Sequence, residues 1–286
     1  MTKEKLTMLA LHGGGVNSEI FATQSRSLRE EFEKQVGKQV EWTFLQAPFA
    51  SKPYPGIDRW FKGPWLVWWR NWIDPDQEEI ERMVSWILSI AEDKGGFDGV
   101  VGFSQGAALA AEVLHAASCS NLPDRTIHHK TRRSGLREAF DSDTSSASSS
   151  DSEEYEPKAT TNKRGSLLLA SKSAGGGFRN QAARSGRLPL FRFGTLICGG
   201  KVHDKNFAPS SGWRKALRIE VPTAHILGRK DAALERGREL EKSCPPELVY
   251  KYEHSGGHEI PMTSHATLAM AKTMARAYKA GTSSDY

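Results

Sequence analysis

The stretch Phe97-Asp-Gly-Val-Val-Gly-Phe-Ser-Gln-Gly-Ala-Ala-Leu-Ala110 decides the fold. Its first half, 97–103, is a short apolar run that is typical of a buried strand, and the Ala-rich continuation to about Ala117 predicts a helix. Between them, Gly102, Ser104 and Gly106 form G-x-S-x-G, a sharp turn that tolerates only small residues on either side of the serine. We expect Ser104 to be a nucleophile at a helix N-terminus, where the dipole and free N–H groups favour developing negative charge. The alternative is a Gly-rich turn without catalysis.

A nucleophilic serine needs a base, and the base needs an acid that orients it. In hydrolases with this turn the chain order is Ser, then Asp or Glu, then His. Asp231 follows a predicted strand at 223–227, and His258 follows one at 248–253. We therefore expect Ser104, Asp231 and His258 to form a catalytic triad. Asp204 remains an alternative acid, and His254, at the strand end, an alternative base.

The other histidines show no partner pattern, and none has cysteines or acids at metal-ligand spacing. They are His115, His128, His129, His203, His225 and His265. The cysteines, Cys119, Cys198 and Cys244, are odd in number and widely spaced, which favours reduced thiols. We expect no metal and no cofactor.

An oxyanion hole requires two backbone donors. The N–H of Gln105 directly follows the nucleophile, and the loop His12-Gly-Gly-Gly15 follows the first predicted strand, at 5–11. Gly13 and Gly14 are the expected donors there, because glycine lets a backbone approach a substrate closely. The loop lacks G-x-G-x-x-G and the P-loop lysine, which argues against a nucleotide site.

Five tryptophans fall within thirteen residues: Trp60, Trp65, Trp68, Trp69 and Trp72. The last four have helix-like spacing, which favours core packing. Their position after a strand end, beside the expected site, favours an aromatic pocket wall for an acyl chain. We expect Trp60, Trp65, Trp68 and Trp69 to line the substrate pocket.

Strands alternate with helices along the chain, which predicts an α/β fold whose mainly parallel sheet carries helices on both faces. Helices are expected at 18–36, 74–92, 104–117, 233–242 and 264–279, and further strands at 40–45 and 191–198. Asp74 is the expected N-cap of the second helix, with Pro75 at its first position. The segment 121–187 is rich in Ser, Gly and charge, so we expect a disordered insertion in one domain spanning 1–286, with a short helix near 134–140.

The formal net charge is +5, but 121–187 alone has 12 Lys and Arg against 8 Asp and Glu, leaving +1 for the rest. The basic balance is therefore no sign of nucleic-acid binding. No stretch approaches the apolar length of a membrane span, and the N-terminus does not look like a signal peptide. We expect a soluble cytoplasmic protein, and the sequence leaves its oligomeric state open.

The chain resembles the FSH family of serine hydrolases, which is common in fungi. The matching stretches lie throughout the chain outside the insertion: LALHGGGVNSEIF, LQAPF, GFSQGAALA, FGTLICGG, VPTAHILGRKD and HSGGHEIP. The resemblance implies an α/β-hydrolase fold and a triad of Ser104, Asp231 and His258. It also implies hydrolysis of esters or thioesters, including the release of polyketide chains from an acyl carrier protein. A small-ester carboxylesterase and a silent acyl-binding scaffold are the alternatives.

Overall fold

The computed structural model describes residues 5–71, 75–120, 189–202 and 217–283. The chain divides into two compact units, Met1–His128 with Leu188–Tyr286, and His129–Arg187. All elements described below belong to the first unit. The expected insertion, its short helix, Trp72 and Asp204 lie outside the described residues. No helix within these ranges is long and apolar enough to cross a membrane.

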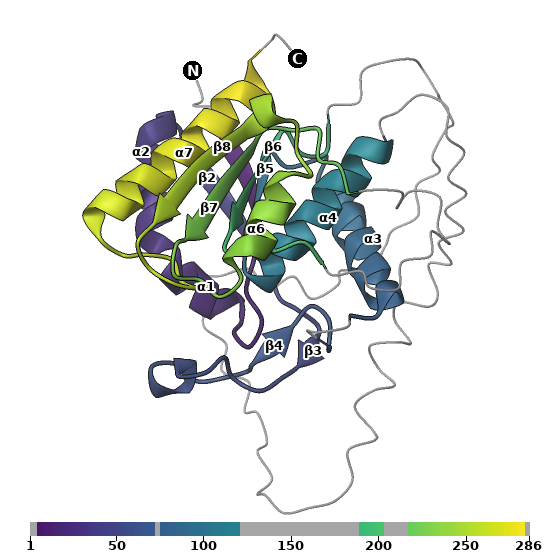
Figure 1. The fold of residues 1–286 in the computed structure, drawn as a ribbon. Helices are drawn as coiled ribbons and strands as arrows, with labels where there is room; N and C mark the ends of the chain where they lie inside the picture. Colours follow the sequence, from purple (N-terminus) through teal and green to yellow (C-terminus); the bar gives the residue numbers. More distant parts are fainter. Residues whose placement is uncertain (1–4, 72–74, 121–188, 203–216, 284–286) are drawn as a thin grey trace, which may run out of the picture. The chain divides into compact units, whose positions relative to one another are not determined.

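Six parallel strands form the main sheet, in the order β2-β1-β5-β6-β7-β8 (Figure 1). Every neighbouring pair in this sheet is parallel. The strands are β1 (Leu6–Leu11), β2 (Val40–Leu45), β5 (Gly99–Phe103), β6 (Phe193–Ile197), β7 (Thr223–Gly228) and β8 (Val249–His254). Their carboxyl ends meet at one edge of the sheet, where ligands bind in open α/β sheets.

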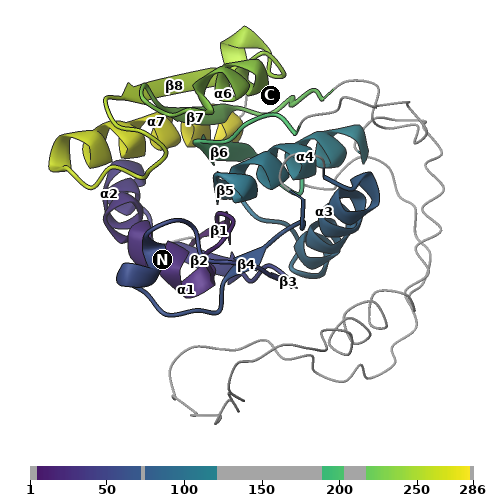
Figure 2. The ribbon, with the colours of Figure 1, turned by 60° about the horizontal axis from the view of Figure 1, so that its bottom comes forward.

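Helices cover both faces of this sheet, as Figure 2 shows. α1 (Ser18–Gln24), α2 (Arg26–Val36) and α7 (Ser264–Thr282) pack on one face. α3 (Gln77–Asp93), α4 (Gln105–Ser120) and α6 (Leu234–Glu241) pack on the other. This arrangement confirms the predicted α/β class.

Alternation along the strands divides the core into two clusters. In β1, Met8 and Ala10 pack toward α2 and α7, whereas Leu9 and Leu11 pack toward α3 and α4. Successive side chains of a strand point to opposite faces, so a strand covered on both faces has to be apolar throughout. This explains why Met8–Leu11 of β1 and the whole of β5 are apolar.

Two helix predictions need correction. The expected helix 18–36 is two helices, because Ser25 leaves the helical region and bonds its hydroxyl to the Phe21 carbonyl. The expected cap at Asp74 is wrong: α3 begins at Gln77, and Asp76 accepts the Glu78 N–H at 2.9 Å. Both aspartates flank Pro75, so the sequence offers two caps and the structure uses the later one.

The segment 47–71, called the Trp segment below, forms no α-helix. It contains a 3-10 turn, Ile57–Arg59, and a two-stranded antiparallel sheet of β3 (Phe49–Ala50) and β4 (Leu66–Val67). A bridge between Val16 and Leu66 connects this small sheet to the loop after β1. The segment therefore lies against the glycine loop at the carboxyl edge of the main sheet.

Candidate active site

Ser104 lies in a strained turn between β5 and α4. Its φ is +55°, a left-handed value that non-glycine residues rarely adopt. A Cβ at Gly102 would collide with the backbone of Gly106, and one at Gly106 with the backbone carbonyl of Leu11. Both glycines are therefore required by backbone packing, which accounts for the G-x-S-x-G pattern.

Three side chains from three strand ends meet at this turn. The His258 Nε2 lies 2.7 Å from the Ser104 hydroxyl, and the His258 Nδ1 lies 2.7 Å from Asp231 Oδ2. The second Asp231 oxygen accepts the Ala233 N–H at 2.8 Å, and the carboxylate is only 5% exposed. The hydrogen bonds thus run in the order acid, imidazole, hydroxyl, which is the order a serine nucleophile needs.

A glycine turn after β8 places His258. The Lys230 N–H donates to the Gly256 carbonyl at 2.9 Å, and a Cβ at Gly228 would collide with the Gly257 carbonyl. His254 is buried instead, and its Nδ1 accepts the Gly256 N–H at 3.2 Å. Burial lowers the pKa of His254. This alternative base therefore supports the loop and does not face Ser104.

The loop after β1 lies against the serine and is fixed by His12. This imidazole is fully buried, with Nε2 accepting the Ala47 N–H at 3.0 Å. Its Nδ1 therefore carries the proton and donates to the Gly13 carbonyl at 2.7 Å. Burial lowers the pKa of His12 to about 4, so the ring is neutral near pH 7. A Cβ at Gly13 would lie 3.4 Å from the Ser104 Cβ, so this backbone adjoins the nucleophile.

Gln105 connects the Trp segment to the turn. Its side-chain oxygen accepts the Trp68 N–H at 2.9 Å, and its amide nitrogen donates to the Trp69 carbonyl at 3.0 Å. The Trp68 indole N–H in turn donates to the His12 carbonyl at 2.7 Å. Gln105 opens α4, so its own backbone N–H is among those that a helix leaves without an intrahelical partner.

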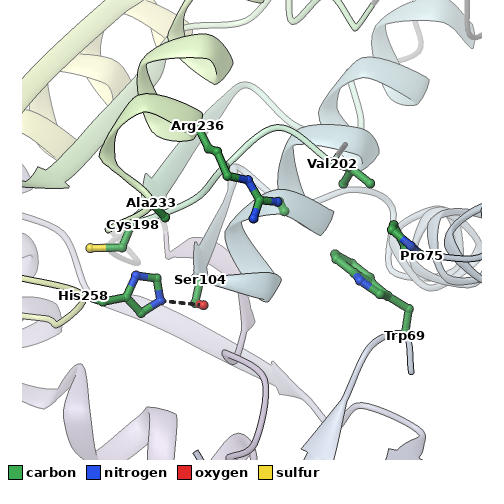
Figure 3. A pocket seen from close by; sticks show the side chains of 10 residues that line it. Trp69, Pro75, Ser104, Cys198, Val202, Ala233, Arg236 and His258 are labelled. Atoms are coloured by element: carbon green, nitrogen blue, oxygen red, sulfur yellow. Dashed lines mark hydrogen bonds between the residues drawn. The ribbon is translucent and has the colours of Figure 1, made fainter. Parts of the chain in front are cut away.

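A small pocket, open to solvent, is lined by Ser104 and His258. Of the four tryptophans predicted to line the pocket, only Trp69 does so, together with Cys198, Val202 and Arg236 (Figure 3). Trp68 is fully buried in the core, Trp60 is 82% exposed, and Trp65 is half-buried. A second hollow, lined by Gly14, Tyr54 and Arg70 among others, lies beside the glycine loop.

The family model described as serine hydrolase (FSH1) matches residues 1–142 and 167–270. The chain belongs to this family. Of the unmatched residues, 143–166 fall within the predicted insertion and 271–286 follow the match. The membership and the hydrogen-bonded arrangement make the chain a serine hydrolase of the α/β-hydrolase fold, as the sequence predicted.

Curated relatives of this hydrolase are esterases of fungi. The probable esterase afoC of Emericella nidulans is 28% identical over 280 residues, covering 90% of this chain and 84% of the relative. Esterase FUS5 of Gibberella moniliformis is 25% identical, covering 95% and 87%. Among solved structures, Arabidopsis thaliana SOBER1 is similar at 13% identity and a TM-score of 0.49, covering 96% of this chain and 99% of that one.

Sequence reasoning missed two aromatic neighbours and a thiol of the hydrolase. The Tyr54 ring stacks on His258 with centroids 6.2 Å apart, and the Phe103 ring lies 5.3 Å away. Cys198 follows β6 with a φ of +49° and lines the pocket. Phe103 carries a sequence signal because it is adjacent to Ser104, and Cys198 lies in the stretch FGTLICGG, which marks the family but no chemistry.

The ligand atoms of Cys198, Asp231 and His258 lie within 4.8 Å of one another. Thiolate, carboxylate and imidazole are zinc ligand types. However, burial and the Asp231 charge raise the pKa of Cys198 to about 12, which keeps the thiol protonated. The His258 Nδ1 and Asp231 Oδ2 are already bonded to each other. This set of groups therefore fits an acid–base relay better than a metal centre.

Proposed function

We propose that Ser104 attacks the carbonyl carbon of an acyl ester or thioester, with His258 as general base and Asp231 as the acid that orients it. The 2.7 Å contact between the His258 Nε2 and the serine hydroxyl carries this proposal. With Nε2 free to accept the serine proton, Nδ1 keeps its hydrogen and donates it to Asp231, which stabilises the imidazolium that forms. His258 then protonates the leaving group and activates water for deacylation.

The proposed oxyanion donors are the backbone N–H of Gln105 and a backbone N–H of Gly13 or Gly14. Gln105 is the first residue of α4, so the positive end of the helix dipole lies at the reacting carbonyl. Gly13 adjoins Ser104, and His12 fixes its carbonyl through a hydrogen bond. Donors held in place before reaction stabilise the tetrahedral intermediate without reorganisation.

For the substrate, we propose an acyl or polyketide chain released from a carrier protein in fungal secondary metabolism. The esterases among the relatives and the apolar side of the pocket, with Trp69 and Val202, support an acyl substrate. The resemblance to polyketide-releasing members of the family supports the thioester. A general small-ester carboxylesterase is the second candidate, because the relatives are named only as esterases.

Ser104→Ala tests the nucleophile. A fluorophosphonate probe should label wild type and leave Ser104→Ala unlabelled, and hydrolysis of 4-nitrophenyl butyrate should fall by about 10⁴-fold or more. Ser89→Ala, an exposed serine of α3, is the matched control and should keep both. Labelling of Ser104→Ala at the wild-type rate would exclude Ser104, and an unlabelled wild type would favour a non-catalytic acyl-binding scaffold.

The preferred leaving group is tested with the same acyl chain attached once as a thioester and once as an oxoester. Wild type should hydrolyse an acyl-pantetheine thioester with a higher kcat/KM than the ethyl ester of the same acid, relative to their uncatalysed rates. A preference for the oxoester would identify a carboxylesterase instead.

We also propose that residues 121–187 are an insertion into a single domain and that their +4 charge attracts an acidic carrier protein. Replacing 123–186 with a short Gly-Ser linker should preserve folding and small-ester hydrolysis. Turnover of a carrier-linked thioester should fall, most strongly at low salt, because salt screens charge attraction. Unchanged carrier-linked turnover would contradict the docking role, and an unfolded deletion variant would contradict the single interrupted domain.

A further inference from the structure

Arg236 extends from the first turn of α6 into the pocket that contains Ser104. Figure 3 shows its guanidinium above the space between Ser104 and Trp69. Ala233, at the start of the same helix, lines the pocket too. A long cationic side chain is therefore placed beside the reacting hydroxyl, although no part of the proposed triad uses it.

The backbone of Arg236 is fixed relative to the nucleophile turn. A Cβ at Gly200 would lie 3.0 Å from the Arg236 Cβ, and one at Gly199 would lie 2.8 Å from the Ala107 Cβ. The Lys201 N–H also donates to the Arg236 carbonyl at 3.3 Å. The loop after β6 is thus packed between α6 and the first turn of α4, which leaves little freedom for the arginine to move away from Ser104.

Among the described residues, most of the guanidinium donors of Arg236 have no hydrogen-bond partner. An arginine has five N–H donors. One of them, on Nη2, makes a long 3.4 Å bond to the Lys201 carbonyl, and the buried Nε has no hydrogen-bond partner among the described residues. No ion pair within those residues includes Arg236, whereas Arg238 of the same helix pairs with Glu235. A buried donor without a partner is costly, so an acceptor that enters the pocket gains the bonds that the protein leaves open.

The electrostatic surroundings favour an anion at this place. Arg236 and the N-terminus of α4 both contribute positive potential, and a cation in the first turn of α6 opposes the dipole of its own helix. Asp231, the carboxylate of the proposed triad, is hydrogen-bonded to His258 and the Ala233 N–H. The arginine thus incurs an electrostatic cost that a bound anion would offset.

We infer that Arg236 binds an anionic oxygen group of the substrate, such as a carboxylate, close to the scissile bond. Guanidinium binds carboxylate through two parallel hydrogen bonds, which provides orientation as well as affinity. This inference rests on the proposed hydrolysis at Ser104. It makes the preferred substrate an ester or thioester that carries a negative charge on its acyl chain or on its leaving group.

Three esters with acyl chains of matched length test whether Arg236 binds a negative charge on the acyl side or on the leaving-group side of the substrate. They are 4-nitrophenyl heptanoate, mono-4-nitrophenyl adipate with a carboxylate on the acyl side, and 3-carboxy-4-nitrophenyl heptanoate with a carboxylate on the leaving group. Arg236→Leu should lower kcat/KM for one of the charged esters by about ten- to a hundredfold and change the neutral ester by less than about twofold. Arg236→Lys should restore part of the loss, and Arg238→Leu is the control for charge on the same helix.

Binding without turnover separates this inference from the proposed function. In a Ser104→Ala background, calorimetry with the preferred charged ester should show about ten- to a hundredfold weaker binding after Arg236→Leu. Equal losses on all three esters would assign Arg236 to the transition state or the fold and overturn the inference, as would no loss on any of them. If wild type hydrolyses none of the three, the proposed function fails, and binding of each charged ester to Ser104→Ala still decides the role of Arg236.

Discussion

The proposed catalytic groups (Ser104, His258 and Asp231) and the pocket lining (Trp69, Val202 and Arg236) meet where Ser104 and His258 border the same pocket, but the two sets are held differently. The catalytic groups lie on turns that backbone packing fixes, and both ring nitrogens of His258 and both oxygens of Asp231 are hydrogen-bonded. The pocket lining consists of side chains from an irregular segment, a loop and a short helix, and the buried Nε of Arg236 has no hydrogen-bond partner among the described residues. Backbone packing therefore fixes the positions of the proposed catalytic groups, whereas the choice of substrate depends on side chains that substitution can change.

Asp231→Asn is the strongest way to break the catalytic groups without disturbing the pocket lining. The amide can donate to His258 Nδ1, which would hold the ring in the tautomer that cannot accept the serine proton. We expect kcat to fall on the order of 10⁴-fold while KM stays within about threefold. Stopped-flow and steady-state ester hydrolysis measure both constants. A loss that appears mainly in KM would show that Asp231 shapes the pocket and does not orient the base.

Gly106→Ala tests whether backbone packing fixes the nucleophile turn. The added methyl would collide with the Leu11 carbonyl, so we expect the free energy of unfolding to fall by several kcal/mol, roughly 3 or more. Gly37→Ala is the control, because Gly37 has a φ of +66° but no atom within 4 Å of an added Cβ. That variant should cost only about 1 kcal/mol, from backbone strain alone. Equal costs in urea unfolding would contradict the packing explanation.

The arrangement of Ser104, His258 and Asp231 was predictable because short sequence patterns mark each part. Gly102 is required by a collision within the turn and Gly106 by one with the Leu11 carbonyl, which produces G-x-S-x-G, and Asp231 and His258 each follow a predicted strand. A parallel sheet brings those strand ends to one edge, so the chain order alone placed the three side chains together.

The pocket lining was not predictable in the same way. Trp65, Trp68 and Trp69 have helix-like spacing, yet Leu66–Val67 pairs with Phe49–Ala50 as a strand. Trp68 and Trp69 follow this strand in a bend, where Trp68 is fully buried in the core and Trp69 lines the pocket. That outcome depends on tertiary pairing, and Arg236 lies in a helix with no motif to mark it.

The pH dependence of stability probes the loop that supports the catalytic groups. Burial lowers the pKa of His12 to about 4, from an ordinary value near 6.5 in the unfolded chain. Between these values the unfolded chain binds more protons, so the free energy of unfolding should fall as the pH falls from about 6.5 to about 4. Urea unfolding at several pH values measures this slope. His225, whose pKa burial also lowers to about 4, contributes to the same slope, so His12→Gln should reduce the slope without removing it. The exposed control His265→Gln should leave the slope as it is, and an unchanged slope in His12→Gln would contradict the buried neutral ring.

Trp68→Phe is the mildest test, because it removes one hydrogen bond where the catalytic groups and the pocket lining meet. The indole N–H of Trp68 donates to the His12 carbonyl, next to the glycine loop, while its backbone N–H is held by Gln105. Losing the indole donor leaves a buried carbonyl short of a partner, at a cost of about 1–3 kcal/mol in unfolding free energy. If this bond also holds the oxyanion donors in place, kcat should fall by about tenfold with little change in KM, since ground-state binding does not need those donors. Trp60→Phe is the matched control, because Trp60 is 82% exposed and should change neither stability nor kcat. A drop in the free energy of unfolding without a drop in kcat would show that Trp68 contributes only to core packing. The hydrogen bond from its indole to the His12 carbonyl would then stabilise the fold without positioning the oxyanion donors.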